Sequence, residues 1–143
     1  MSTWPDVEGG LRTYLRANSG VSALVGNRVF FGVPRKATET SFPLVTVQRV
    51  GGGADLSDAP VDVALLQVDC WGSLNANGDP LKVTATHLVN TVRAALEAVN
   101  GRTTLTSGVD AFGITVESVV WAPDPDNDRP RYSVTAEVTA IAS

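Results

Sequence analysis

The sequence is poor in the residues that build metal and redox sites. Cys70 is the only cysteine and His87 the only histidine among 143 residues. A single cysteine cannot form an internal disulfide, so we expect the chain to be made and kept in a reducing cytosol. With no second histidine and no cysteine pair, the usual ligands of a zinc site are missing. The sequence therefore predicts no metal and no cofactor.

Long apolar runs are also missing. No segment has about 18 apolar residues in succession, so no transmembrane helix is expected. The first ten residues, MSTWPDVEGG, have neither a basic region nor an apolar stretch, so no signal peptide is expected. We therefore predict no membrane partner.

Charge is scarce as well. Charged residues make up 18% of the chain, which is low for an isolated globular protein. The 11 basic and 15 acidic side chains give a net charge of −4, which argues against affinity for a nucleic-acid backbone. A surface so short of charge indicates that another subunit covers part of it. The length is that of one domain, over residues 1–143.

The apolar pattern predicts two helices and six strands. The first helix begins near Asp6 and ends at Gly20, and the second covers residues 79–99 with Asp79 as its N-cap. Strands are expected over residues 28–33, 44–50, 61–71, 103–107, 112–121 and 131–142. Short connections favour antiparallel pairing, so the order α-β-β-β-α-β-β-β predicts an α+β two-layer domain. In this domain, a mainly antiparallel sheet has two helices packed on one face.

The second helix has a clear apolar stripe and an unusual opposite face. Apolar residues at steps of three and four form the stripe: Leu81, Ala85, Leu88, Val92, Leu96 and Val99. The opposite face holds Val83, Thr86, His87, Asn90, Ala94 and Glu97. A solvated helix face usually carries several charges, whereas only Glu97 is certainly charged here. His87 and Asn90 are therefore candidate interface residues.

The strand over residues 61–71 is apolar on both parities. Ala64 and Leu66 share one parity, while Val61, Val63 and Leu65 share the other, which should face water. A strand that is apolar on both faces needs two covers. The second cover is either a neighbouring subunit or a long loop folded over the sheet. The first alternative makes Val61, Val63 and Leu65 candidate interface residues.

A glycine tract precedes this strand. Gly51, Gly52 and Gly53 follow a strand, as a phosphate-binding loop would, but such a loop must open directly into a helix. Here ADLSDAPVDV follows, and Gly-Lys-Ser/Thr occurs nowhere in the chain. We interpret the tract as part of a flexible hairpin loop. Its glycines and the solvated Asp55 and Asp58 predict a loop that is exposed in the free subunit and docks on another protein.

Catalytic groups do not gather in the sequence. Cys70 shares its strand parity with Leu66 and Val68, which predicts a buried, inert thiol. A dyad of Cys70 with His87 stays open, although His87 would have to turn against the stripe of its own helix. No serine lies in a nucleophile elbow. We therefore predict no catalytic residues and no enzyme activity.

An acidic loop lies before the last strand. Asp124, Asp126 and Asp128 resemble the beginning of a calcium-binding loop. The EF-hand pattern then requires a glycine and a later glutamate, whereas Arg129 and a proline follow here. We keep these aspartates and Arg129 as candidate protein-interface residues.

Three stretches of the chain resemble a known family. They are VEGGLRTYLRANSGVSALVGNRVFFGVP, then FPLVTVQRV, and then, after a polar loop, LLQVDCWG. Their order and spacing are similar to those of the tail terminator (tail completion) proteins of long-tailed bacteriophages. The similarity covers about residues 7–99 and includes the helix after the polar turn. From residue 103 onward only the strand pattern agrees.

The resemblance implies a structural virion protein. The family implies an α+β subunit that assembles into a homo-oligomeric ring, usually a hexamer, with no enzyme activity. The ring would cap the finished tail tube, stop its growth and offer a surface to the head-side connector protein. Its place would be the head-proximal end of the virion tail, after assembly in the host cytoplasm. The acidic balance fits a channel through which DNA passes without specific binding.

Other functional classes remain as alternatives. One is a different virion part of similar fold, such as a head–tail connector or a tail-tube subunit. The other is a small hydrolase or ligand-binding α+β domain. The size of the protein in solution, with and without tail-tube protein, distinguishes these classes.

Overall fold

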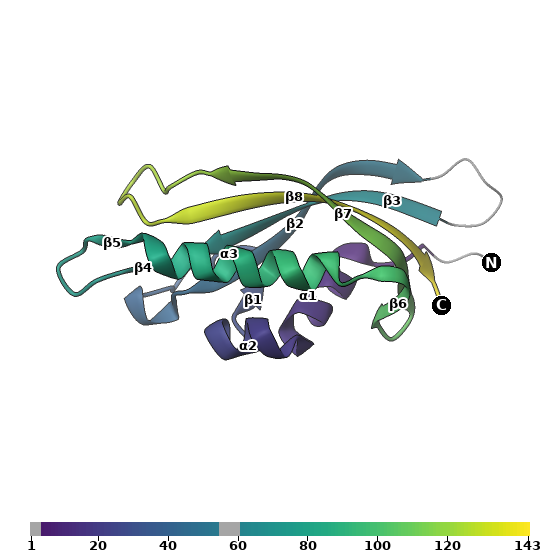
Figure 1. Ribbon diagram of the computed structural model, residues 1–143, viewed down its shortest axis with the longest axis horizontal. Helices are drawn as coiled ribbons and strands as arrows, with labels where there is room; N and C mark the ends of the chain where they lie inside the picture. The colour runs from purple at the N-terminus through teal and green to yellow at the C-terminus, as the bar shows by residue number, and fades with distance from the viewer. Residues whose placement is uncertain (1–3, 55–60) are drawn as a thin grey trace.

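The computed structural model describes residues 4–54 and 61–143 as a curved sheet with helices on one face (Figure 1). The elements are α1 (Val7–Ala17), α2 (Ser19–Val25), β1 (Val29–Phe30), η1 (Glu39–Ser41), β2 (Leu44–Ala54), β3 (Val61–Trp71), β4 (Ser73–Leu74), β5 (Pro80–Leu81), α3 (Lys82–Glu97), β6 (Asn100–Thr106), β7 (Val109–Trp121) and β8 (Arg131–Ala142). The six-stranded sheet has the order β1-β2-β3-β8-β7-β6. Among the strands of the described residues only β1 and β2 are parallel, so the expected α+β fold with a mainly antiparallel sheet is confirmed.

Three helices, rather than the two expected, cover the sheet. Asn18 is the reason for the extra helix, because it ends α1 and begins α2. Its backbone N–H donates to the carbonyl of Tyr14, while its Oδ1 accepts from the backbone N–H of Val21 at 3.1 Å. Gly20, the expected end of the first helix, lies inside α2. All three helices lie on the same side of the sheet (Figure 1).

The third helix begins later than predicted. Asp79 is not its N-cap, because Pro80 and Leu81 form β5 and pair with β4. The backbone N–H of Asp79 instead donates to Oδ1 of Asn75 at 2.9 Å, which closes this small hairpin. The helix ends at Glu97, and Asn100 already belongs to β6. The predicted stripe is buried from Ala85 onward, whereas Leu81 is 36% exposed.

The predicted strand bounds agree best with the structure in the middle of the sheet. The bounds of β3 and β8 are those expected. Strands β6 and β7 begin three residues earlier than predicted, and β1 is reduced to two residues. Two of these strands, β1 and β6, are the edge strands of the sheet, where tertiary contacts rather than local preference decide how far pairing extends.

The glycine tract belongs to β2, so its interpretation as loop was wrong. Gly51, Gly52 and Gly53 pair with Leu65, Ala64 and Val63 of β3, beyond a bulge between Arg49 and Gly51. Glycine is required at one of these positions. Gly52 has φ of +86°, and a Cβ placed there would lie 2.1 Å from the carbonyl oxygen of Val63. Asp55 and Asp58 lie outside the described residues.

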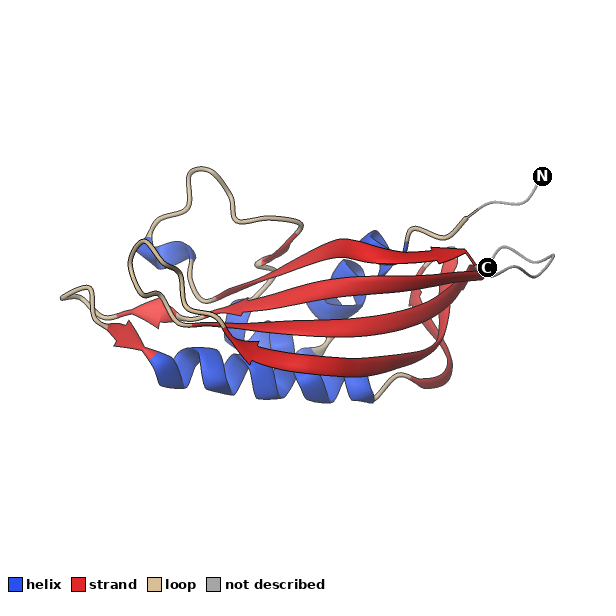
Figure 2. Cartoon of the chain, turned by 90° about the horizontal axis from the view of Figure 1, so that it is seen from above, coloured by secondary structure: helices blue, strands red, loops and turns tan. Residues whose placement is uncertain are grey.

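The core lies between the helices and one face of the sheet. Its fully buried residues include Leu11 and Leu15 of α1, Leu88 and Leu96 of α3, and Leu66 of β3. No helix of residues 4–54 and 61–143 lies on the other face of the sheet (Figure 1). Val61, Val63 and Leu65 alternate with the core residues of β3 and are half-buried. Seen from above, the long strands lie side by side along this face (Figure 2).

The helices are short relative to a membrane span. None of those within residues 4–54 and 61–143 is long and apolar enough to cross a bilayer.

Candidate interaction site

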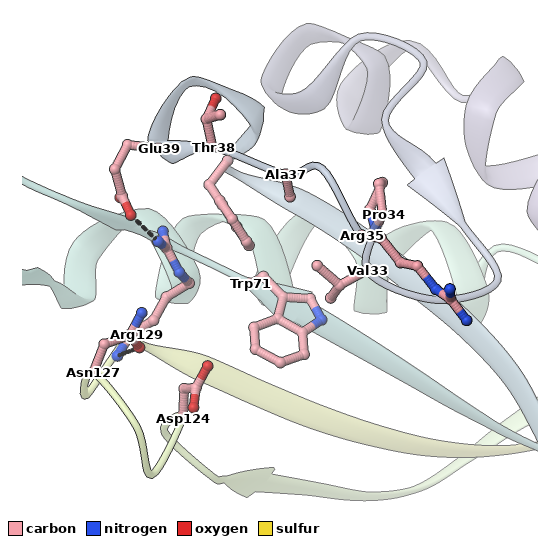
Figure 3. Close-up of a pocket in the computed structure, with 11 residues that line it drawn as sticks. Val33, Pro34, Arg35, Ala37, Thr38, Glu39, Trp71, Asp124, Asn127 and Arg129 are labelled. Atoms are coloured by element: carbon pink, nitrogen blue, oxygen red, sulfur yellow. Dashed lines mark hydrogen bonds and ion pairs between the residues drawn. The ribbon is translucent and has the colours of Figure 1, made fainter.

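A pocket of about 410 Å³ lies at one end of the sheet (Figure 3). The connection from β1 to β2, the end of β3 and the loop between β7 and β8 form its walls. The lining residues are Val33, Pro34, Arg35, Ala37, Thr38, Glu39, Phe42, Trp71, Asp124, Asn127 and Arg129. Phe42 and Trp71 pack together in this wall, with ring centroids 6.3 Å apart and tilted by 59°. The pocket thus combines aromatic surface with charged groups of both signs.

Arg129 holds the three walls of this pocket together. Its guanidinium carbon lies 3.6 Å from the ring centroid of Phe42. The same guanidinium donates to Oε1 of Glu39 at 2.5 Å and to the carbonyl of Gly72 at 3.3 Å. A planar guanidinium can stack on an aromatic ring and donate at its edge at the same time. The segments that meet here are therefore cross-linked by one side chain.

The structure corrects the expected surface position of Arg129. The residue is 3% exposed, and its side chain cannot serve as a freely exposed contact. The sequence around it does not show this, because Gly72 and Glu39 are 57 and 90 residues away. Phe42, Trp71 and Glu39 were missed at the sequence level for the same reason. No local motif marks them as neighbours.

The three aspartates of the β7–β8 loop build its turn. Oδ1 of Asp124 accepts from the backbone N–H of Asp126 at 2.9 Å, and the N–H of Asp128 donates to the carbonyl of Asp124. Asp128 has a positive φ of 57°, which aspartate tolerates better than most residues. Asp126 and Asp128 are exposed, and Asp124 lines the pocket. Within residues 4–54 and 61–143, no three His, Cys, Asp or Glu side chains gather as a metal site would require.

The other predicted interface residues lie on two further surfaces. His87 and Asn90 are exposed on α3, on the face turned away from the core, as predicted. Gly51 and Gly53 pair with Leu65 and Val63, so the tract and the outer face of β3 form one surface. The structure does not bring this surface together with the outer face of α3, because sheet and core lie between them.

Cys70 and His87 lie in different environments. Cys70 is fully buried in the core, whereas His87 is exposed on the outer side of α3. Burial raises the pKa of the Cys70 thiol well above its usual range, so the thiol stays protonated and is a poor nucleophile. The dyad left open by the sequence is therefore not assembled.

A direct test follows from these positions. His87→Ala and Cys70→Ser variants are expected to retain function in a plaque assay, because neither side chain contributes to a catalytic arrangement. Thermal unfolding should be measured in parallel, since a buried serine hydroxyl needs a hydrogen-bond partner. Loss of plaques in a well-folded His87→Ala variant would contradict this prediction and make an enzyme function a candidate again.

Comparison with known proteins identifies the family. The family model described as tail completion protein gp17 matches residues 9–141 of the chain. The chain belongs to the tail completion protein gp17 family. This tail completion protein is therefore a structural protein of the bacteriophage tail, in agreement with the resemblance seen in the sequence.

A solved structure shares the fold of this tail completion protein. A chain in the virion of a native gene transfer agent (GTA) particle superposes with a TM-score of 0.65 at 20% sequence identity, over 95% of each chain. At this identity the match shows the fold alone. No curated protein sequence matches the chain.

Proposed function

We propose that copies of this tail completion protein form a ring, usually hexameric in such proteins, on the head-proximal end of the tail tube. The ring ends tube growth and provides the surface on which the head-side connector docks. Assembly takes place in the host cytoplasm, and the ring remains in the virion. The uncovered face of the sheet is the observation that carries this proposal. Val61, Val63 and Leu65 form an apolar patch on this face, and an isolated subunit gains no stability from leaving such a patch in water.

The composition of this face supports a protein partner. Val61, Val63 and Leu65 are half-buried on it, and Gly51 and Gly53 next to them present backbone without side chains. Such a surface can approach a flat partner closely and gains from burial at about 25 cal/mol per Å² of apolar area. We assign it to contacts with the tube or with a neighbouring subunit.

The charge balance supports a channel role rather than DNA binding. The net charge is −4, so the subunit repels a nucleic-acid backbone at long range. A ring through which DNA moves needs this property, because phosphate contacts would hold the DNA in place.

Tail length in a phage that lacks this gene tests the proposal. Electron microscopy should show tubes of widely varying and greater length, and heads without tails. The wild-type gene supplied in trans should restore one length and joined particles. Tubes of normal length that merely fail to join heads would contradict the terminator role and favour a connector. Absence of any tube would favour a tube subunit.

A further inference from the structure

Exposed apolar residues gather at the beginning of α3. Leu81 is 36% exposed, Val83 is 71% exposed and Trp121 is 40% exposed. The ammonium of Lys82 lies 4.7 Å from the ring centroid of Trp121, and Trp121 packs edge-on against Tyr132 with centroids 5.0 Å apart. We call Leu81, Lys82, Val83 and Trp121 the α3 knob. A protruding tryptophan with aliphatic neighbours is typical of the centre of a protein interface.

The pocket around Phe42 has room for apolar side chains of this kind. Val33, Phe42 and Trp71 give it apolar walls, and its volume of about 410 Å³ exceeds that of any single side chain. Val33 is 40% exposed at its mouth. Arg129 makes the pocket rigid by linking Glu39, Gly72 and Phe42. Tryptophan is enriched in interface hot spots, and Trp71 supplies one in the pocket wall.

Pocket and knob lie at the same end of the strands. The knob contains the last residue of β7, the pocket lies beside β2 and β3, and the β7–β8 loop reaches from one to the other. Strand pairing places the residues of both surfaces in adjacent rows across β2, β3, β8 and β7. The pairs are Leu44 with Trp71, Trp71 with Arg131, and Tyr132 with Trp121. The β1–β2 connection borders one edge of the sheet, and the start of α3 lies towards the other (Figure 2). A second copy placed beside the first can therefore bring its knob to the pocket without a shift along the strands.

We propose that the α3 knob of one copy inserts into the Phe42 pocket of the next copy. This contact rests on the proposed ring and names the surfaces that close it. Because knob and pocket are different surfaces, the contact is head-to-tail, and head-to-tail contacts generate rings when the rotation closes. An isologous dimer would need one surface that complements itself.

Charge complementarity favours a second copy as the occupant. Lys82 is the only charged residue of the knob. The pocket is lined by Asp124, which forms no ion pair within the described part of the chain, and Asp126 and Asp128 follow on the same loop. Arg35 also lines the pocket and would repel the ammonium of Lys82. The attraction therefore comes from the side of the pocket formed by the β7–β8 loop. Opposite charges at the rim fix orientation more than they add affinity.

Two single variants test the contact. Val83→Glu places a carboxylate on the knob, and Val33→Glu places one at the mouth of the pocket. Both residues are exposed, so both variants should fold, which thermal unfolding checks. Sedimentation should show rings for the wild type and monomers for each variant, with at least a tenfold higher concentration needed for assembly. Phe112→Glu is the matched control, because Phe112 is 41% exposed at the β6–β7 end and should assemble normally.

Mixing the two variants gives the sharper result. The Val33→Glu chain keeps an intact knob and the Val83→Glu chain keeps an intact pocket, so an equimolar mixture has one functional contact. The expected product is a one-to-one heterodimer that grows no further. A mixture that stays monomeric, or variants that form rings alone, would overturn the knob-and-pocket contact while leaving the ring intact. Loss of assembly in Phe112→Glu as well would also overturn it. A wild-type chain that stays monomeric, even on tube ends, would instead overturn the ring itself.

Discussion

Replacing Leu88 by alanine is expected to lower the free energy of unfolding by about 2–5 kcal/mol. Leu88 is fully buried on α3 and belongs to the cluster that joins the helices to the sheet. Truncation removes buried apolar area and leaves a cavity that the sheet, fixed by its hydrogen bonds, cannot fill by collapsing. Denaturant titration measures the effect as a lower midpoint at an unchanged slope.

Val83→Ala on the same helix is the control for this prediction. Val83 is 71% exposed in the separate subunit, so its truncation should change the free energy of unfolding of the monomer by about 0.5 kcal/mol or less. Both variants replace an aliphatic side chain of the same helix by alanine, and the largest difference between them is burial. Similar losses in both variants would show that the stripe does not face the core.

Gly52→Ala is expected to destabilise the β2–β3 hairpin by about 2–5 kcal/mol. About 1–2 kcal/mol comes from placing an L residue in left-handed backbone. About 1–3 kcal/mol comes from overpacking, because the new Cβ would lie 2.1 Å from the carbonyl oxygen of Val63 and 2.8 Å from the backbone nitrogen of Leu65. Both contacts are with backbone, which cannot move aside as a flexible side chain would.

Gly53→Ala provides the matched comparison. A Cβ at Gly53 would lie within 4 Å of no atom in the described part of the chain, and the φ of Gly53 is outside the positive range. Its replacement should leave stability unchanged or raise it by about 0.4–1 kcal/mol, because alanine restricts the unfolded chain. Thermal unfolding of both variants decides the matter. Equal melting temperatures would mean that the tract is a loop after all, as the sequence had suggested.

Local patterns predicted the parts of the fold that depend on neighbours in the chain. The stripe of α3 from Ala85 to Val99 is buried, and the alternation in β3 and β8 gave the right bounds. These predictions succeeded because helix and strand periodicity is set by residues a few positions apart. The start of α3 was wrong because Asp79 and Pro80 suit a hairpin as well as a helix start, and pairing with β4 decided between them.

Three predictions failed, two of them where distant segments meet and one, at Asn18, through local capping. Gly51 to Gly53 have a loop composition but lie in β2, because β3 supplies the pairing partners. Asn18 divides one expected helix into two by capping both. Arg129 was expected on the surface, but Phe42 and Glu39 enclose it. Composition alone cannot show such partners.

The sequence by itself determined the fold class, the core stripe of α3 and the resemblance to tail completion proteins, since all of these depend on local order and spacing. Only the tertiary structure decided where the interaction site lies. Phe42, Trp71 and Arg129 come from three separate segments, and the hydrogen bonds of Arg129 reach across 57 and 90 residues. A pocket is formed by the packing of segments in space, and the free energy that aligns them comes from the whole buried core rather than from any motif.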